Sequence, residues 1–373
     1  MSAHILHICC NMAGSTVFGQ LFEALRDAGL RQTVFVPEKR AENMNKNAPR
    51  GVTAHYALTV RASDALFFPM KARRSVPAIR KAVDLSGVTL IHAHTLFTDG
   101  SIAYKLSRQT GIPYVLTLRY SDIEVIWRAE PHLRPMARRI LRGARQVVFL
   151  SGCSREKVLH GWFGREEAAA LREKTAIIPN GIDEAWLGGC AREALGDPVR
   201  VGFAGLLNRR KRPLDALAAV HRANGEGERR YVLRACGGGP LEEKLRAGLR
   251  EGDAFVGRVQ GMEAMKAFYA TCDVLLVPSS ADTFGMVYLE AMSQGVPVLY
   301  TRGQGFDGQF PEGEVGYSVL CGDIAQQAQR LGDVARDYTQ RSARCVACAE
   351  AYAWPRVAQR WAALYARAQE CAM

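Results

Sequence analysis

The stretch from Val277 to Met292 reads VPSSADTFGMVYLEAM and decides the fold. The apolar run 274–277 is typical of a buried strand and ends at Pro278; a polar loop follows, and Gly285 opens a helix. A strand that passes through a loop into a helix is the repeating unit of a parallel sheet with helices on both faces. Free N–H groups at the start of such a helix suit a phosphate or a polar sugar.

The same rhythm of strands and helices extends outward in both directions. A first half with strands at 4–10, 33–36, 88–92, 114–118 and 147–150 also carries an amphipathic helix at 15–28. The rhythm restarts with strands at 200–204, 231–234, 254–256, 274–277 and 296–299, and the glycine-containing stretch 184–198 lies between the halves. This pattern predicts an α/β protein of two doubly wound, Rossmann-like domains that bind ligands at the carboxyl ends of their strands.

Composition agrees with a globular protein of two domains. The chain has 373 residues, of which 48% are hydrophobic and 23% charged, and no apolar run approaches the ~20 residues that span a bilayer. The N-terminus is typical of a first strand and not of a signal peptide, and the ten cysteines form no regular framework, so we expect a reduced, cytoplasmic protein. The Cys345-x-x-Cys348 pair lies in a helical pattern and is interpreted as packing, not as a zinc site.

A net charge of +12 would attract nucleotide phosphates, nucleic acid or an anionic membrane. Charge alone does not choose among them. The sequence has no zinc finger, RNP-like segment or helix-turn-helix pattern, so nucleic acid is the least supported partner.

Two segments of the second half carry candidate chemistry. Asp282 and Glu290 flank the start of the helix after 274–277 and could point into one cleft; alternatively Asp282 caps the helix and Glu290 is a solvated charge. The segment from Gly205 to Pro213 joins a strand to a helix through four consecutive cations, 209–212. Cations there could neutralise a pyrophosphate leaving group, or the segment could be a solvated basic loop.

These segments resemble the signatures of glycosyltransferase family 4, a large retaining family with the GT-B fold. Asp282 and Glu290 are similar to its E-x7-E pair, with Asp in the first place. The resemblance implies that Glu290 hydrogen-bonds the ribose of a nucleotide and that Asp282 lies near the donor sugar. Lys211 matches a lysine that the family places about six positions after a glycine, here Gly205, whereas Leu206 stands where the family usually has arginine.

The resemblance extends along most of the chain. Residues 178–183 resemble a segment that closes the first domain, 237–240 a turn after a strand, and Arg258 a contact to the base. Trp354 resembles the start of a C-terminal helix that crosses back to the first domain. The resemblance implies an acceptor-binding domain at 1–185, a nucleotide-sugar domain at 198–350 and the crossing helix at 351–373. Its donor-binding residues would be Gly14, Gly205, Arg210, Arg258, Thr283, Phe284, Gly285 and Met286.

The acceptor side is expected to involve His94, Arg119 and Asp122. His94 ends the strand at 88–92 and could face a ligand or simply be packed. Arg119 stands where the family commonly has a functional histidine, and an arginine cannot accept a proton. The leaving phosphate could take the proton instead, with Arg119 holding that phosphate or an anionic acceptor and Asp122 orienting Arg119.

Two basic stretches, 67–81 and 127–145, place cations beside aromatic residues. That combination suits an anionic bilayer face and a lipid-linked saccharide acceptor. The alternative is that the two stretches are ordinary solvated helix faces, which have the same composition.

Together these observations predict a retaining hexosyltransferase that uses a UDP- or GDP-sugar as donor and a saccharide or lipid-linked saccharide as acceptor. Its expected setting is polysaccharide, lipopolysaccharide or glycolipid biosynthesis in the cytoplasm, on the inner face of the cell membrane. We expect no cofactor or metal, because no D-x-D pair ends a strand. The alternatives are a sugar-nucleotide 2-epimerase on the same fold and an inactive scaffold, the latter suggested by Leu206 and Asp282.

Overall fold

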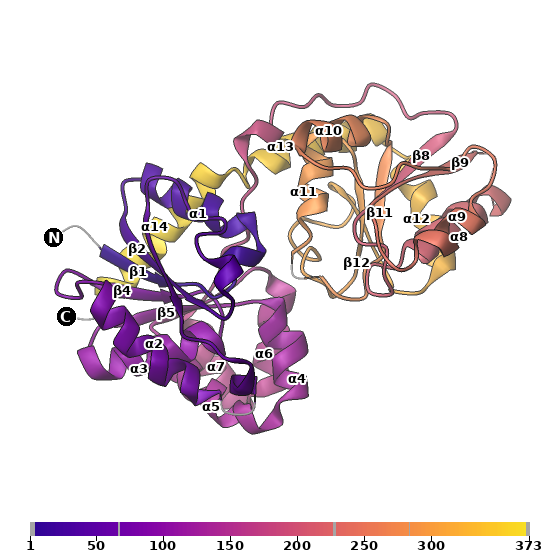
Figure 1. Cartoon of the computed structure of the whole chain (residues 1–373). Coiled ribbons are helices and arrows are strands. Elements are labelled where there is room, and N and C mark those ends of the chain that lie inside the picture. The colour runs from indigo at the N-terminus through magenta and orange to yellow at the C-terminus, as the bar shows by residue number, and fades with distance from the viewer. Residues whose placement is uncertain (1–3, 66–67, 227–228, 283, 371–373) are drawn as a thin grey trace. The chain divides into compact units, whose positions relative to one another are not determined.

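A computed structural model describes residues 4–65, 68–226, 229–282 and 284–370. The chain folds into two compact units (Figure 1). The first comprises residues 1–150, 154–181 and 354–373, and the second comprises 151–153 and 182–353. These units are defined by contacts within the chain, and the domain bounds expected from the sequence, 1–185, 198–350 and 351–373, stay predictions.

The first unit is built on a seven-stranded parallel sheet with the order β3-β2-β1-β4-β5-β6-β7. Its strands are β1 His4–Ile8, β2 Arg31–Glu38, β3 Thr53–Leu58, β4 Leu90–Ala93, β5 Tyr114–Leu118, β6 Gln146–Phe149 and β7 Thr175–Ile177. Both faces of the central strands are buried, which is why these strands are nearly continuous apolar runs without polar alternation.

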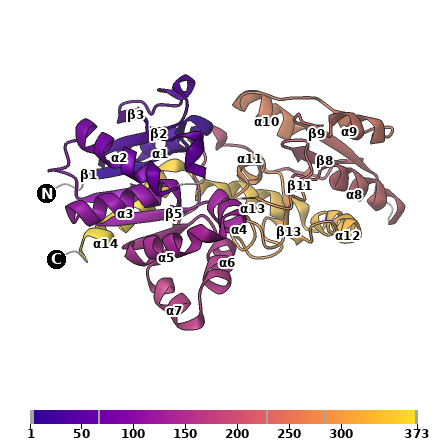
Figure 2. The same cartoon turned by 60° about the horizontal axis from the view of Figure 1, so that its bottom comes forward.

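Helices cover both faces of this sheet (Figure 2). The helices that follow the strands of the first half are α1 Thr16–Asp27, α2 Pro69–Ala82, α3 Thr98–Thr110, α4 Trp127–Ala129, α5 Arg134–Gly143, α6 Gly152–Trp162 and α7 Arg165–Glu173. One core joins Leu6, Ile91 and Leu116 to α2, α3 and α5. The other core joins Ile5, Leu90 and Val115 to α1 and to the C-terminal helix α14, Trp354–Glu370. A π-helical turn, Ser121–Ile126, precedes α4.

The C-terminal helix α14, Trp354–Glu370, returns to the first unit and confirms the predicted crossing. The Trp354 indole donates to Gln20 of α1 at 3.2 Å, and the Tyr365 hydroxyl is 2.7 Å from Nδ1 of His92 in β4. The apolar stripe of α14 therefore completes one of the two cores of this unit.

The second unit repeats the plan with a six-stranded parallel sheet of order β10-β9-β8-β11-β12-β13. Its strands are β8 Val199–Ala204, β9 Tyr231–Cys236, β10 Ala254–Phe255, β11 Val274–Val277, β12 Val298–Thr301 and β13 Gly316–Val319. Its helices are α8 Pro213–Glu226, α9 Glu242–Gly248, α10 Met262–Ala270, α11 Met286–Ser293, α12 Ile324–Val334 and α13 Tyr338–Glu350.

The strand order places each candidate site. In both sheets the order reverses beside the first strand, between β1 and β4 and between β8 and β11. The loops that leave such neighbours diverge to opposite faces, which opens a crevice at the carboxyl ends of the strands. In the second unit these two loops are 205–212 and 278–285, the segments that carry Lys211 and Asp282.

Within the described part of the chain, no helix combines the length and the apolar character needed to cross a membrane.

Candidate active site

The crevice of the second unit brings together the two segments that the sequence singled out. Nζ of Lys211 donates to Oδ2 of Asp282 at 2.6 Å, and both side chains are mostly buried, with 14% and 13% of their surfaces exposed. Asp282 therefore does not cap α11, whose N-cap is Gly285 without a side-chain bond. The segment around Lys211 is likewise more than a solvated basic loop, because its lysine is committed to a specific carboxylate.

The loop after β8 is shaped to present Lys211. Gly205 has φ +151°, a conformation that favours glycine, and the Lys211 amide donates to Oδ1 of Asn208 at 2.9 Å. The Arg210 carbonyl accepts from the amide of Ser280 at 2.8 Å, which ties this loop to the one after β11. Lys211 is thus fixed by its backbone as well as by Asp282.

The neighbouring cations differ in what they can offer. Nε of Arg212 donates to Asp215 at 2.6 Å, so that guanidinium already has a carboxylate partner. Arg209 and Arg210 are exposed. Leu206, which stands where the family usually has arginine, has 51% of its surface exposed. Position 206 therefore contributes an exposed apolar side chain, and no charge, to this loop.

The loop from Pro278 to Gly285 is held by its backbone. The Asp282 amide donates to Oε1 of Gln304 at 3.1 Å, and the Asp282 carbonyl accepts from Gly305 at 3.2 Å. Gly285 has φ +82°, and a Cβ built on it would lie 2.4 Å from the Tyr288 ring and 3.7 Å from Oδ2 of Asp282. This position therefore requires glycine for two reasons: its positive φ and the lack of space for a Cβ.

Thr283, Phe284 and Met286 are the other predicted donor-binding residues of this segment, and the last two differ in burial. Phe284 has 1% of its surface exposed and packs against Phe306 and Tyr352, so only its backbone could contact a ligand. Met286 is partly buried in the first turn of α11. Thr283 lies outside the described residues.

Glu290 is not a solvated charge. It is partly buried on α11, and its Oε2 accepts a hydrogen bond of 2.9 Å from the hydroxyl of Tyr269 on α10. Burial raises the pKa of Glu290, and the bond from Tyr269 opposes that rise. Sequence reasoning missed Tyr269, because nothing in a helix pattern shows which buried tyrosine ends beside a carboxylate.

Glycines also shape the floor of this crevice. A Cβ on Gly237 would lie 1.8 Å from the Gly205 carbonyl oxygen, so the loops after β8 and β9 touch backbone to backbone. A Cβ on Gly238 would lie 2.4 Å from Nε of Arg258, whose exposed side chain lies against that glycine. The structure thus places Gly205 and Arg258 with Lys211 at the carboxyl edge of one sheet.

The first unit holds the predicted acceptor-side residues at the corresponding edge. The Asp122 carboxylate accepts from the Arg119 amide at 2.9 Å and from the Phe97 amide at 3.4 Å, and burial raises the pKa of Asp122 to about 6. Asp122 therefore fixes the backbone of Arg119. The guanidinium is held separately, by a 3.1 Å bond from its Nε to the His94 carbonyl and by the Phe18 ring 4.3 Å away.

His94 itself is packed, and its side chain has no exposed surface. Its Nε2 is 3.1 Å from Nδ1 of His7, and its ring lies 3.9 Å from that of His92. Burial lowers the pKa of His94 well below its usual value, so the ring is neutral. The backbone carbonyl of His94, not its imidazole, contributes to this edge by holding Arg119.

The loop after β1 is more open than the others. Gly14 is exposed, and a Cβ on it would meet nothing within 4 Å. Ser15 caps α1 through its hydroxyl, which accepts from the Val17 amide at 3.3 Å. Unlike Gly285, Gly14 therefore has no neighbouring atoms that would exclude a side chain. Its place in the donor-binding set stays a prediction.

Two residues that the sequence analysis did not assign to the acceptor side lie at the same edge. The Asp99 carboxylate is fully buried, accepts from the Cys10 amide at 3.0 Å and has its pKa raised by burial to about 7. Nζ of Lys71 is 3.2 Å from the Thr98 hydroxyl and 3.5 Å from the centre of the Phe68 ring. A signal for Asp99 was available, since it follows a strand next to the point where the strand order reverses.

The Cys345-x-x-Cys348 pair is packed as predicted. Cys345 has no exposed surface and its thiol is 3.4 Å from the Val315 carbonyl, while Cys348 faces Glu314.

Comparisons with known proteins cover almost the entire chain. Residues 192–351 match the family model of glycosyl transferases group 1, and residues 13–181 match that of a glycosyl transferase 4-like domain. A D-inositol 3-phosphate glycosyltransferase of Corynebacterium urealyticum is 31% identical over 47% of this chain and 45% of its own length. A phosphatidyl-myo-inositol mannosyltransferase of Mycobacterium leprae is 32% identical over 54% of this chain and 56% of its own length.

The chain thus spans about half the length of these curated relatives. A solved structure of Anabaena HepE, in complex with UDP and glucose, covers 98% of this chain and 100% of its own with a TM-score of 0.69. At 17% identity this likeness concerns the fold alone. That fold is the GT-B fold, which the resemblance to glycosyltransferase family 4 implied and which the two parallel α/β sheets of this chain fit.

Proposed function

Because the chain belongs to the group 1 glycosyl transferases of family 4, we propose that it transfers a hexosyl group, with retention, from a nucleotide-diphosphate sugar to an acceptor hydroxyl. The observation that carries the proposal is the pairing of Lys211 with Asp282 beside the start of α11, with Glu290 one helix turn further into the unit. A pyrophosphate needs a cation, a sugar needs a carboxylate and a ribose needs a second carboxylate, and this edge offers all three.

Lys211 would stabilise the negative charge that develops on the leaving pyrophosphate. Its present partner, Asp282, would then be released toward the hydroxyls of the donor sugar, helped by the N–H groups at the start of α11. Glu290 would accept from the ribose hydroxyls. Arg258, the exposed Arg210 and the backbone of Gly205 are proposed as further donor contacts.

On the acceptor side, the fixed guanidinium of Arg119 would hold the leaving phosphate or an anionic acceptor. Because Arg119 cannot accept a proton, the leaving phosphate itself would take the proton of the attacking hydroxyl. Asp122 acts through the backbone of Arg119 in this scheme. The protein then contributes position and charge, which is sufficient for front-face transfer.

We propose a UDP- or GDP-sugar as donor. A GDP-mannose-dependent alpha-(1-6)-phosphatidylinositol monomannoside mannosyltransferase of Mycolicibacterium smegmatis, 29% identical over 65% of this chain, supports a GDP-sugar. HepE, which shares the fold, was solved with UDP and glucose, and neither likeness decides the donor of this chain. The decisive experiment is a calorimetric and thermal-shift screen of UDP, GDP, ADP, CMP and their sugars on the wild type and on Glu290→Ala. One nucleotide should stabilise the wild type and not the variant. If no nucleotide binds the wild type, the inactive-scaffold alternative takes the place of this proposal.

Two further assays define the reaction. Release of nucleoside diphosphate should require an acceptor hydroxyl or water, whereas an epimerase would convert the donor sugar without releasing the nucleotide. Proton NMR of the product should show the same anomeric configuration as the donor. An inverted product would contradict the proposal of retention.

We propose a lipid-linked saccharide acceptor at an anionic membrane surface as the finer alternative to a soluble saccharide. It is supported by cations of the basic stretches that are exposed, Arg73, Arg80, Lys81 and Arg139. Others in these stretches serve the fold, because Arg74 pairs with Asp64 and Arg142 with Glu167. Sedimentation with phosphatidylglycerol vesicles, but not with phosphatidylcholine vesicles, would support the membrane; equal recovery with both would contradict it.

A further inference from the structure

The carboxylate of Glu290 has few hydrogen-bond partners for an acid that is partly buried. Among the residues that the structure describes, the Tyr269 hydroxyl is the one group that donates to its side chain, and no cation lies within ion-pair distance. The titratable groups that interact with it are Tyr269 on α10 and Cys236 on β9. A single phenol therefore decides how this carboxylate is held.

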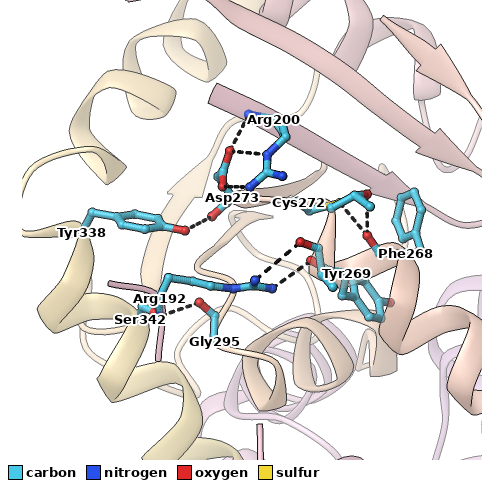
Figure 3. Close-up of polar contacts among 11 residues, drawn as sticks. Arg192, Arg200, Phe268, Tyr269, Cys272, Asp273, Gly295, Tyr338 and Ser342 are labelled. Atoms are coloured by element: carbon cyan, nitrogen blue, oxygen red, sulfur yellow. Dashed lines mark hydrogen bonds and ion pairs between the residues drawn. The ribbon is translucent and has the colours of Figure 1, made fainter. Parts of the chain in front are cut away.

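Tyr269 is itself fixed from several sides. It has no exposed surface, and its ring lies 6.1 Å from that of Trp186. The carbonyls of Tyr269 and Ala270 accept from the Arg192 guanidinium at 3.1 and 3.4 Å (Figure 3). The Tyr269 carbonyl also accepts from the Cys272 amide at 3.0 Å, so Arg192 reinforces the C-terminal end of α10. The position of the Tyr269 hydroxyl is therefore fixed independently of Glu290.

Arg192 is anchored in turn. Its amide donates to the Ser342 hydroxyl at 2.7 Å, and that hydroxyl donates to the Gly295 carbonyl at 2.5 Å (Figure 3). Gly295 follows α11, the helix that carries Glu290. The end of α10 and the end of α11 are thus held by one connected set of hydrogen bonds, and the bond between Tyr269 and Glu290 joins the same two helices.

We infer that Tyr269 is the positioning residue for the nucleotide-binding carboxylate: its hydroxyl holds Oε2 of Glu290, so that the charged group can accept from a ribose hydroxyl through its other oxygen. The inference rests on the proposed function, in which Glu290 binds ribose. A hydrogen bond to a charged group is stronger than one between neutral groups, so its loss weakens every interaction that depends on the ionised form.

The test is the ratio of the affinities for UDP and 2′-deoxy-UDP, or for GDP and 2′-deoxy-GDP if the screen selects guanine. The wild type should prefer the ribonucleotide, and Tyr269→Phe should reduce that preference by about tenfold. The affinity of Tyr269→Phe should also begin to fall at a higher pH than that of the wild type. With the phenol gone, burial acts unopposed on the pKa of Glu290, and the carboxylate becomes neutral earlier as the pH is lowered.

Tyr338→Phe is the matched control. Tyr338 is a buried tyrosine of the same unit whose hydroxyl donates to the Asp273 carbonyl at 3.0 Å and does not touch Glu290 (Figure 3). It should lower the melting temperature by a similar amount and leave the ribose preference and the pH profile unchanged. If Tyr269 had only a structural role, Tyr269→Phe would behave like Tyr338→Phe: its melting temperature would fall, and its ribose preference and pH profile would stay unchanged.

Arg192→Met is the second variant, because it loosens the end of α10 while it retains both the phenol and the carboxylate. It should reduce the ribose preference in the same direction but less. An unchanged preference in the folded variants, while the wild type still distinguishes the two nucleotides, overturns the role of Tyr269 and leaves the proposed function standing. A wild type that binds no nucleotide overturns both.

Discussion

Nζ of Lys211 lies 2.6 Å from Oδ2 of Asp282, although the two residues are 71 positions apart in the sequence. They come from the loops after β8 and β11, which are neighbours at the point where the strand order reverses. The pair is mostly buried, so neither charge is well solvated when the other is removed. In the proposed function, a diphosphate that binds at this edge would pair with Lys211 and so release the Asp282 carboxylate.

We predict that Lys211→Met slows release of nucleotide from the donor sugar by about 100-fold or more, because the cation that stabilises the developing pyrophosphate charge is lost. Steady-state kinetics with the donor selected by the nucleotide screen provide the measurement. Lys266→Met is the control, since Lys266 pairs with Glu263 on the surface of α10 in the same unit. An unchanged turnover in Lys211→Met would contradict the proposed role of this lysine.

We predict that Gly285→Ala destabilises the second unit by about 3 kcal/mol, from strain at positive φ together with contact against the Tyr288 ring. Gly111→Ala separates these causes. Gly111 is also left-handed, with φ +76° at the end of α3, but a Cβ there would meet nothing within 4 Å, so it should cost only about 1 kcal/mol. Urea unfolding of the two variants measures the difference. Equal costs would show that the Tyr288 ring yields to the added methyl group.

Much of this fold could be predicted because its central strands are apolar on both faces. The runs at 114–118 and 274–277 coincide with β5 and β11, and each is fully buried. The strands that the sequence did not indicate are β3, β7 and β13. These are edge strands, and the burial of β3 and β7 is only partial, so their sequences lack the long apolar run that marks a central strand.

The candidate site divides in a similar way. Lys211 and Asp282 could be predicted because the segments that carry them resemble the signatures of a known family, and their place in loops at the carboxyl edge of a parallel sheet agrees with that resemblance. The packing of His94 could not be decided, because its fate depends on His7 and His92 from neighbouring strand positions. Tyr269 and Asp99 act through contacts with residues far away in the sequence, and periodicity does not report such contacts.

We predict that donor turnover survives EDTA. The sequence offers no D-x-D pair after a strand, and Lys211 supplies a positive charge where a pyrophosphate would need it. The measurement is turnover of the donor in an excess of chelator, before and after addition of Mg²⁺ or Mn²⁺. Lys211→Met is treated in parallel. Loss of activity that either ion restores in the wild type would overturn the expectation that no metal is required.

The final prediction concerns acid stability of the first unit. Burial lowers the pKa of His7 to about 3 and those of His92 and His94 well below the usual value. These rings are neutral when folded but take up protons on unfolding once the pH is below about 6.5. Their contribution to stability is complete above that pH and is lost as the pH falls toward the folded values, by up to about 1.4 kcal/mol per pH unit for each ring.

The buried acids of the same unit act in the opposite sense. The pKa values of Asp99 and Asp122, raised to about 7 and about 6, mean that burying these carboxylates costs stability at neutral pH, and that this cost disappears as the pH falls toward 4. Between pH 7 and 5, His94→Gln should therefore make the loss of stability shallower, whereas Asp99→Asn should make it steeper. Hydrogen exchange of β1 and β4 peptides measures both, with the exposed His160→Gln as the control that leaves the slope unchanged. Slopes that change in the same direction for the two variants would show that the histidines and the acids do not titrate as their burial implies.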